Sequence, residues 1–163
     1  MAARDVVIIG IVLFILAMAF FVTRFAGTTI VTGFLSVPSI NATGPDTIAA
    51  FQSINTVTSR ADYLFGTFLF GLLLSLIITA WFIAGNPLFM FLYFIFVVLG
   101  VILSAVFSNV FQTVVAQAIF GTTINSLPII NHVLNFLPYY VAVSGFIGMI
   151  VMFGKPQWGG GFQ

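Results

Sequence analysis

Side chains that can carry charge or transfer a proton are few in this chain. The full set is Arg4, Asp5, Arg24, Asp46, Arg60, Asp62, His132 and Lys155. Acid–base catalysis needs a positioned group of this kind, and a metal site needs several ligands close together. The sequence contains no group of such residues close together, and it contains no cysteine. We therefore expect no catalytic residue, no metal site and no cofactor.

Asp62 and His132 are the strongest candidates for chemistry. Asp62, with Arg60 two residues before it, stands at the start of a long apolar run. These two residues could take part in ion conduction or catalysis, or they could anchor the chain at a membrane surface. We favour the role as anchors. His132 is either a ligand or proton relay, or a hydrogen-bonded interfacial residue, and we favour the latter because no partner of its kind stands nearby. The remaining expected anchors are Arg24, Lys155 and Trp158.

The composition excludes a soluble globular protein. Hydrophobic residues make up 61% of the 163 residues and charged residues only 4%, whereas soluble domains contain roughly 25% charged residues. A net charge of +1 also provides no basic surface for nucleic acid. We therefore expect the lipid bilayer to surround the chain, and we see no sign of a small-molecule substrate.

Apolar runs of spanning length predict an all-α polytopic membrane protein with about four transmembrane helices. A hydrocarbon core of about 30 Å needs about 20 helical residues. The predicted spans are 6–22, 63–84, 88–108 and 136–153. The first run is either a cleaved signal peptide or a retained span, and we favour the span because the run is longer than the usual 7–15 residues. With four spans, Arg4 and Lys155 lie on one side of the membrane and Arg24 and Arg60 on the other. The basic residues therefore do not determine the orientation.

The segments between the spans differ in character. Gly85, Asn86 and Pro87 predict a tight helical hairpin between spans two and three, because Gly ends helices and Pro begins them. Residues 24–62 predict a polar loop followed by an amphipathic helix from Asp46 to Arg60. Residues 112–135 predict an interfacial or re-entrant element, and the tail 154–163 is predicted to be flexible.

Small residues recur every four positions on spans two and three, a spacing that lets helices approach closely in lipid. Gly71 and Gly100 lie at similar distances from the turn, so we expect them to meet. Since no span carries a buried carboxylate, lysine or arginine, transport is disfavoured. The residues expected to pack helices are Gly71, Ser75, Thr79, Gly100, Ser104 and Ser108.

Several short segments, in which polar residues stand within or beside the apolar runs, resemble those of a known group of proteins. They are Asp62-Tyr63-Leu64-Phe65, Asn86-Pro87-Leu88-Phe89, Leu103-Ser104-Ala105-Val106-Phe107-Ser108-Asn109-Val110, Asn131, Leu137-Pro138, Gly145-Phe146-Ile147 and Met149-Ile150-Val151-Met152-Phe153-Gly154-Lys155. This layout, over about residues 46–155, resembles small membrane proteins encoded by bacteriophages and archaeal viruses, especially viruses with a membrane inside the particle.

The resemblance implies no catalytic residue. Our first interpretation is a structural membrane protein of a virus or phage, in a virion or host membrane, that packs with copies of itself or with other membrane or capsid proteins. One alternative is a holin-like pore-forming lysis protein. Another is an accessory transmembrane subunit of a larger cellular complex.

Overall fold

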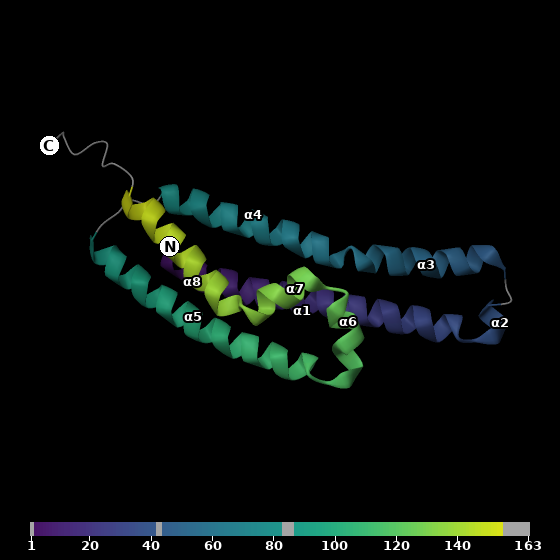
Figure 1. The fold of residues 1–163 in the computed structure, drawn as a ribbon. Helices are drawn as coiled ribbons and strands as arrows, with labels where there is room; N and C mark the ends of the chain where they lie inside the picture. Colours follow the sequence, from purple (N-terminus) through teal and green to yellow (C-terminus); the bar gives the residue numbers. More distant parts are fainter. Residues whose placement is uncertain (1, 42–43, 83–86, 155–163) are drawn as a thin grey trace.

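The computed structural model describes residues 2–41, 44–82 and 87–154, and these ranges are helical with short turns and no strand (Figure 1). Four helical stretches among them are long and apolar enough to cross a membrane: Val6–Leu35, Pro45–Phe82, Phe91–Val115 and Leu137–Gly154. The predicted class, an all-α polytopic membrane protein with four spanning helices, is confirmed.

The elements follow one another closely. The long helices are α1 (Ala2–Leu35), α3 (Pro45–Ser59), α4 (Ala61–Phe82), α5 (Pro87–Val115) and α8 (Leu137–Gly154). The short ones are α2 (Pro38–Asn41), the 3₁₀ helix η1 (Ala118–Phe120), α6 (Gly121–Asn125) and α7 (Pro128–Asn135). Helix α4 follows α3 almost without a break, since Arg60 between them keeps right-handed helical dihedral angles.

Helices α1, α4, α5 and α8 form the bundle that would occupy the bilayer (Figure 1). Helix α5 packs on α8 and α1, and α4 packs on the same two helices, whereas the described parts of α4 and α5 hardly touch. With 22 residues in α4 and 18 in α8, the two helices are about 33 Å and 27 Å long. These lengths match a hydrocarbon core of about 30 Å.

We expected spans two and three to pack on each other, but the described parts of α4 and α5 hardly touch. Pro87 begins α5 as predicted, while Gly85 and Asn86 lie outside the described residues. Helices α4 and α5 run antiparallel, but α1 and α8 supply their packing surfaces (Figure 1). Gly71 and Gly100 accordingly do not meet: a Cβ added at Gly71 would touch nothing, and one at Gly100 would approach Val141 and Val7.

The polar loop expected from residue 24 onward does not begin there, because α1 continues as a helix to Leu35. Threonine side chains in this part donate to carbonyls of their own helix, as Thr28 does to Arg24 at 2.8 Å and Thr32 to Thr28 at 2.7 Å. Such bonds let hydroxyl residues stay in a helix. Residues 25–41 and 44–59 thus form an antiparallel pair of helices beyond the bundle, which we call the projecting hairpin (Figure 1).

Helix α3, predicted from Asp46 to Arg60, begins one residue earlier and ends one residue earlier. Gly44 precedes it with a φ of 116°, a conformation that favours glycine, and Pro45 takes the first helical position. No side chain caps the start of this helix, and Asp46 lies within its first turn. The face expected to be apolar does turn toward α1: Phe51 stacks on Phe34 with ring centroids 5.2 Å apart.

Residues 112–135 do not form one element. Helix α5 continues through Gln112 to Val115, and a turn then leads into η1, α6 and α7. With eight residues, about 12 Å, α7 is too short to span the bilayer. Its apolar side is buried against the end of the bundle through Ile130, Val133 and Leu134. Gly154 closes α8, and the rest of the predicted flexible tail lies outside the described residues.

Candidate functional site

The buried charge of Arg24 lies where the bundle ends and the projecting hairpin begins. Its side chain is only 9% exposed. Its Nη1 donates to the Asn55 side-chain oxygen at 2.7 Å, to the Asn55 carbonyl at 3.1 Å and to the Thr58 hydroxyl at 3.0 Å. Its Nε donates to the Ser126 hydroxyl at 3.3 Å. One guanidinium therefore ties α1 to α3 and to the turn after α6, through neutral acceptors.

Asp62 is the second buried charge, with 3% of its surface exposed. Its two carboxylate oxygens accept the backbone N–H groups of Ile129 at 3.0 Å and Ile130 at 2.8 Å. These are the second and third residues of α7, where N–H groups lack partners within the helix. A residue of α4 thus caps α7 across 67 positions of sequence, and its negative charge suits the positive end of the helix dipole.

Helix α7 is also held at its other end. The Ser108 hydroxyl of α5 donates to the carbonyl of Asn135, the last residue of α7, at 2.9 Å. Gln112 donates to the Ser108 oxygen at 3.4 Å, and the Asn135 amide turns back to Asn131. With Asp62 at its first turn and Ser108 at its last residue, α7 bridges α4 and α5 across the end of the bundle.

The expected anchors therefore divide into two groups. Arg24 and Asp62 are buried and hydrogen-bonded, so they do not extend into the interface as predicted. Arg60 is exposed at the junction of α3 and α4, as an anchor requires. Lys155 and Trp158 lie outside the described residues. His132 is exposed, with its ring 4.9 Å from that of Phe136 and 6.2 Å from that of Tyr140.

The small residues of span three face other helices, whereas those of span two do not. Ser104 and Ser108 are buried, and Gly100 lies against Val141. On span two, Gly71 and Ser75 are exposed, and Ser75 and Thr79 line a recess. The small residues that recur every four positions on span three thus pack against other parts of the chain. Those on span two border open space.

A close contact between α5 and α8 was not predicted. The hydroxyl of Tyr93 on α5 donates to the carbonyl of Gly145 on α8 at 3.1 Å. A Cβ added at Gly148 would collide with this hydroxyl, and one at Gly145 would come within 2.7 Å of Val97. Ser144 and Gly148 are four residues apart. Helix α8 therefore also has the four-residue spacing of small residues that we noted on spans two and three.

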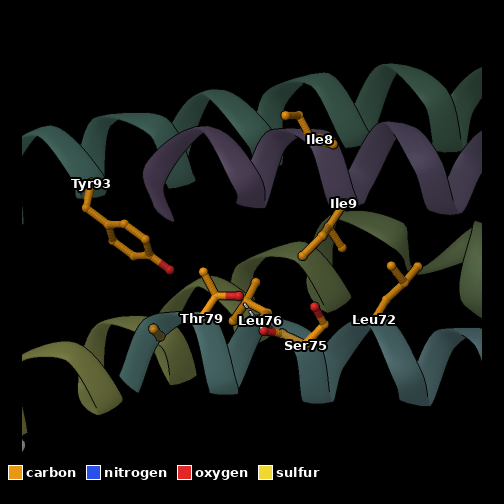
Figure 2. A pocket seen from close by; sticks show the side chains of 8 residues that line it. Ile8, Ile9, Leu72, Ser75, Leu76, Thr79 and Tyr93 are labelled. Carbon is orange, nitrogen blue, oxygen red and sulfur yellow. Dashed lines mark hydrogen bonds between the residues drawn. The ribbon is translucent and has the colours of Figure 1, made fainter. Parts of the chain in front are cut away.

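A lateral crevice opens between α1 and α4, with Tyr93 of α5 as its end wall (Figure 2). Its volume is about 190 Å³. The lining residues include Ile8, Ile9, Leu72, Ser75, Thr79 and Tyr93.

The polar side chains inside the bundle bond to the protein itself. Ser104 donates to Val101, Ser144 to Val141 and Thr79 to Ser75, each to a carbonyl of its own helix. Among the described residues, no fully buried side-chain nitrogen or oxygen lacks a partner, and no group of three potential metal ligands occurs. The described part of the bundle interior is therefore packed and hydrogen-bonded.

Comparison of the chain with protein-family models, curated proteins and solved structures gives no match. The class of the molecule therefore rests on its own architecture: a polytopic α-helical membrane protein with a polar layer at one end of its bundle.

Proposed function

We propose that this chain is a structural membrane protein that acts by assembling with copies of itself through the projecting hairpin. The bundle holds the chain in the bilayer, and the hairpin presents a binding surface outside it. No step of this function requires chemistry on a substrate. The observation that carries the proposal is the hairpin, which extends past the bundle and leaves apolar side chains uncovered.

The lengths of the helices support a position of the hairpin outside the hydrocarbon core. Helix α1 has 34 residues, about 51 Å, and α3 with α4 covers 38 residues, about 57 Å. Both exceed the roughly 30 Å of the hydrocarbon core by about 20 Å or more. Arg24, Arg60 and Asp62 lie where the excess begins, and charged residues are stable at that depth.

The surface of the hairpin supports a protein partner. Helix α3, whose 15 residues are all described, has no buried residue. Ile30, Phe34, Ile54 and Val57 of the hairpin are exposed, and Val57 has 68% of its surface uncovered. Large apolar side chains left exposed outside a membrane favour an interaction site.

The chemistry of this surface favours a second copy of the chain as the partner. Asp46 is the only charged residue between Arg24 and Arg60 in the sequence. The surface is otherwise built from Ser, Thr, Asn, Gln and apolar side chains, so charge pairs cannot select the partner. A partner surface of the same neutral kind is required, and each further copy of the chain supplies one.

The hairpin is attached rigidly enough to serve as a binding element. Arg24 bonds α1 to α3 at its base, and Phe34 stacks on Phe51 farther out. Between these contacts, Gly27 lets α3 approach closely, since a Cβ there would lie 2.8 Å from the Thr58 methyl group. A pre-ordered surface loses less entropy on binding than a flexible one.

The membrane of a virus or phage particle is the setting that we propose for this assembly. Its support is the resemblance of residues 46–155 to membrane proteins of such particles. The hydrogen-bonded interior of the bundle speaks against a pore formed by a single chain. Expression in a bacterial host tests the holin-like alternative: we expect silent accumulation, and abrupt depolarisation of the membrane would contradict the structural role.

Self-association of the full chain in detergent tests the role of the hairpin. The double variant Ile54→Ala and Val57→Ala removes two exposed apolar side chains from α3. The matched control, Ile102→Ala and Val106→Ala, makes the same changes at similarly exposed positions of α5. We expect the first variant to weaken association by about tenfold, because burying two such side chains contributes more than 1.4 kcal/mol.

Analytical ultracentrifugation over a dilution series measures both association constants. Association that is lost only in the α5 control would place the contact on the bundle. A wild-type chain that stays monomeric at all concentrations would also contradict the proposal.

A further inference from the structure

The lateral crevice between α1 and α4 is a cavity at membrane depth that the chain does not fill (Figure 2). Helix α4 borders it with the small side chains of Ser75, Thr79 and Ala80 and with the larger ones of Leu72 and Leu76. The opposite wall is formed by Ile8 and Ile9 of α1. At about 190 Å³ it is smaller than the roughly 300–1,000 Å³ of pockets for whole small ligands.

The packing of the bundle explains why the space exists. Helices α4 and α5 pack on α1 and α8 rather than on each other, and of the α5 side chains that the structure describes, from Phe91 to Val115, only Tyr93 borders the crevice. The Tyr93 ring forms the end wall, and its hydroxyl is bonded to Gly145 of α8. Small residues that usually let two helices meet therefore leave a void here.

The position of the mouth determines which molecules can reach it. Ser75 lies seven residues before Phe82, the last residue of α4, and so about 10 Å inside that end of the bundle. Ser75 and Ile8 are exposed, as are Leu74 and Ile78 beside them on α4. In a hydrocarbon core of about 30 Å, the mouth therefore faces acyl chains.

Of the hydroxyl groups on the described residues of the wall, those of Thr79 and Tyr93 are bonded to the protein, and that of Ser75 lies at the mouth. The Thr79 hydroxyl donates to the Ser75 carbonyl at 2.7 Å, and the Tyr93 hydroxyl donates to Gly145. What remains exposed to an occupant is mostly apolar surface. Apolar cavities of this size, roughly 150 Å³ or more, exclude water and bind hydrocarbon.

From these observations we propose that the crevice binds part of an acyl chain of one membrane lipid. The chain enters between Ser75 and Ile8 and ends against the ring of Tyr93. The lipid headgroup stays at the membrane surface on the side of Phe82. The bound chain restores dispersion contacts that an empty crevice lacks, and so joins α1 to α4.

Photolabelling from within the bilayer tests this site. The full chain is placed in phosphatidylcholine vesicles that contain a phosphatidylcholine with a diazirine on its acyl chain, and labelled residues are identified by mass spectrometry. In the wild type, we expect labelling at Ile9, Thr79 and Tyr93, all of which lie inside the crevice. Labelling that is confined to exposed residues of α4 would overturn the proposal.

The variant Ser75→Leu fills the mouth, and Thr67→Leu is its matched control. Both positions are exposed hydroxyl residues of α4, but Thr67 lies outside the crevice. We expect Ser75→Leu to reduce labelling of Ile9 and Tyr93 several-fold, and Thr67→Leu to leave it unchanged. Equal labelling in both variants would overturn the proposal.

Thermal unfolding in detergent, with and without added phosphatidylcholine, provides a second readout. The lipid should raise the Tm of the wild type and of Thr67→Leu more than that of Ser75→Leu, because ligands stabilise the state that binds them. If Ser75→Leu instead converts a dimer to a monomer and the lipid gives no labelling inside the crevice, a side chain of a second copy is the occupant and the proposal fails.

Discussion

Arg24 shows how a single residue can join elements that the sequence separates. Its four hydrogen bonds reach acceptors on α3 and after α6, 31 to 102 residues away. A guanidinium suits this role because its donors point in several fixed directions, whereas a lysine ammonium is a compact point charge. Its burial in a layer of neutral oxygens keeps the charge stable at the end of the bundle.

Substitution Arg24→Lys should therefore destabilise the protein although the charge is kept. We expect a loss of about 2 kcal/mol, because each hydrogen bond to a charged group contributes about 1.5–3 kcal/mol and Lys cannot reach all the acceptors. Denaturant unfolding in detergent measures it. Arg60→Lys is the control, since Arg60 is exposed and should tolerate the change. Equal stability of both variants would refute the bridging role of Arg24.

Asp62 has a comparable role at the start of α7. Asp62→Asn keeps the shape of the side chain but offers one acceptor oxygen in place of two to the N–H groups of Ile129 and Ile130. We expect a loss of about 1–3 kcal/mol and faster hydrogen exchange at these two amides. Asp46→Asn is the control, because Asp46 also stands in a first helical turn but is exposed. A loss of the same size in both variants would argue against the cap.

At the scale of elements, α8 is the helix that brings the bundle together. Gly145 and Gly148 leave a notch on its surface, and Tyr93 and Val97 of α5 occupy it. The Tyr93 hydroxyl finds its acceptor at the bottom of the notch, so close packing and hydrogen bonding depend on the same glycines.

Gly148→Ala should separate α5 from α8. The added Cβ collides with the buried Tyr93 hydroxyl, and overpacking of this kind costs about 1–3 kcal/mol. Gly71→Ala provides the contrast, because its Cβ meets nothing and the higher helix propensity of Ala should stabilise α4 by up to about 1 kcal/mol. Thermal unfolding of both variants compares them, and a Gly148→Ala variant as stable as the wild type would show that the notch is not filled.

The whole molecule consists of a bundle of membrane length and a hairpin that extends beyond it (Figure 1). Exposure alone does not distinguish the two parts: Ile15 on the bundle is 61% exposed and Val57 on the hairpin 68%. Under the proposed function, only the surrounding medium differs, with lipid around the first and water around the second.

Cysteine labelling checks this division directly, since the natural chain contains no cysteine. A membrane-impermeant maleimide is added to one side of sealed vesicles at a time. Val57→Cys should react when the reagent is on one of the two sides. Ile15→Cys, although similarly exposed in the structure, should react from neither. The side that labels Val57 also gives the orientation of the protein. Protection of both residues would mean that the hairpin lies in the bilayer or under a partner.

The sequence alone determined the class of this protein and the approximate position of its spans. Runs of about 20 apolar residues with almost no charge have few alternatives, because each unpaired backbone group in hydrocarbon costs several kcal/mol and a helix pairs them locally. For that reason the predicted second and fourth spans, 63–84 and 136–153, lie close to α4 and α8, at Ala61–Phe82 and Leu137–Gly154.

Only the tertiary structure decided what Arg24, Asp62 and the small residues do. From the sequence, Arg24 and Asp62 were expected at the interface, since partners 31 to 102 residues away leave no local pattern. The stripe of Gly71 and Ser75 had the spacing of a helix contact, yet α4 turns it away from α5. Hydropathy is a property of each segment by itself, whereas these roles arise from which segments become neighbours.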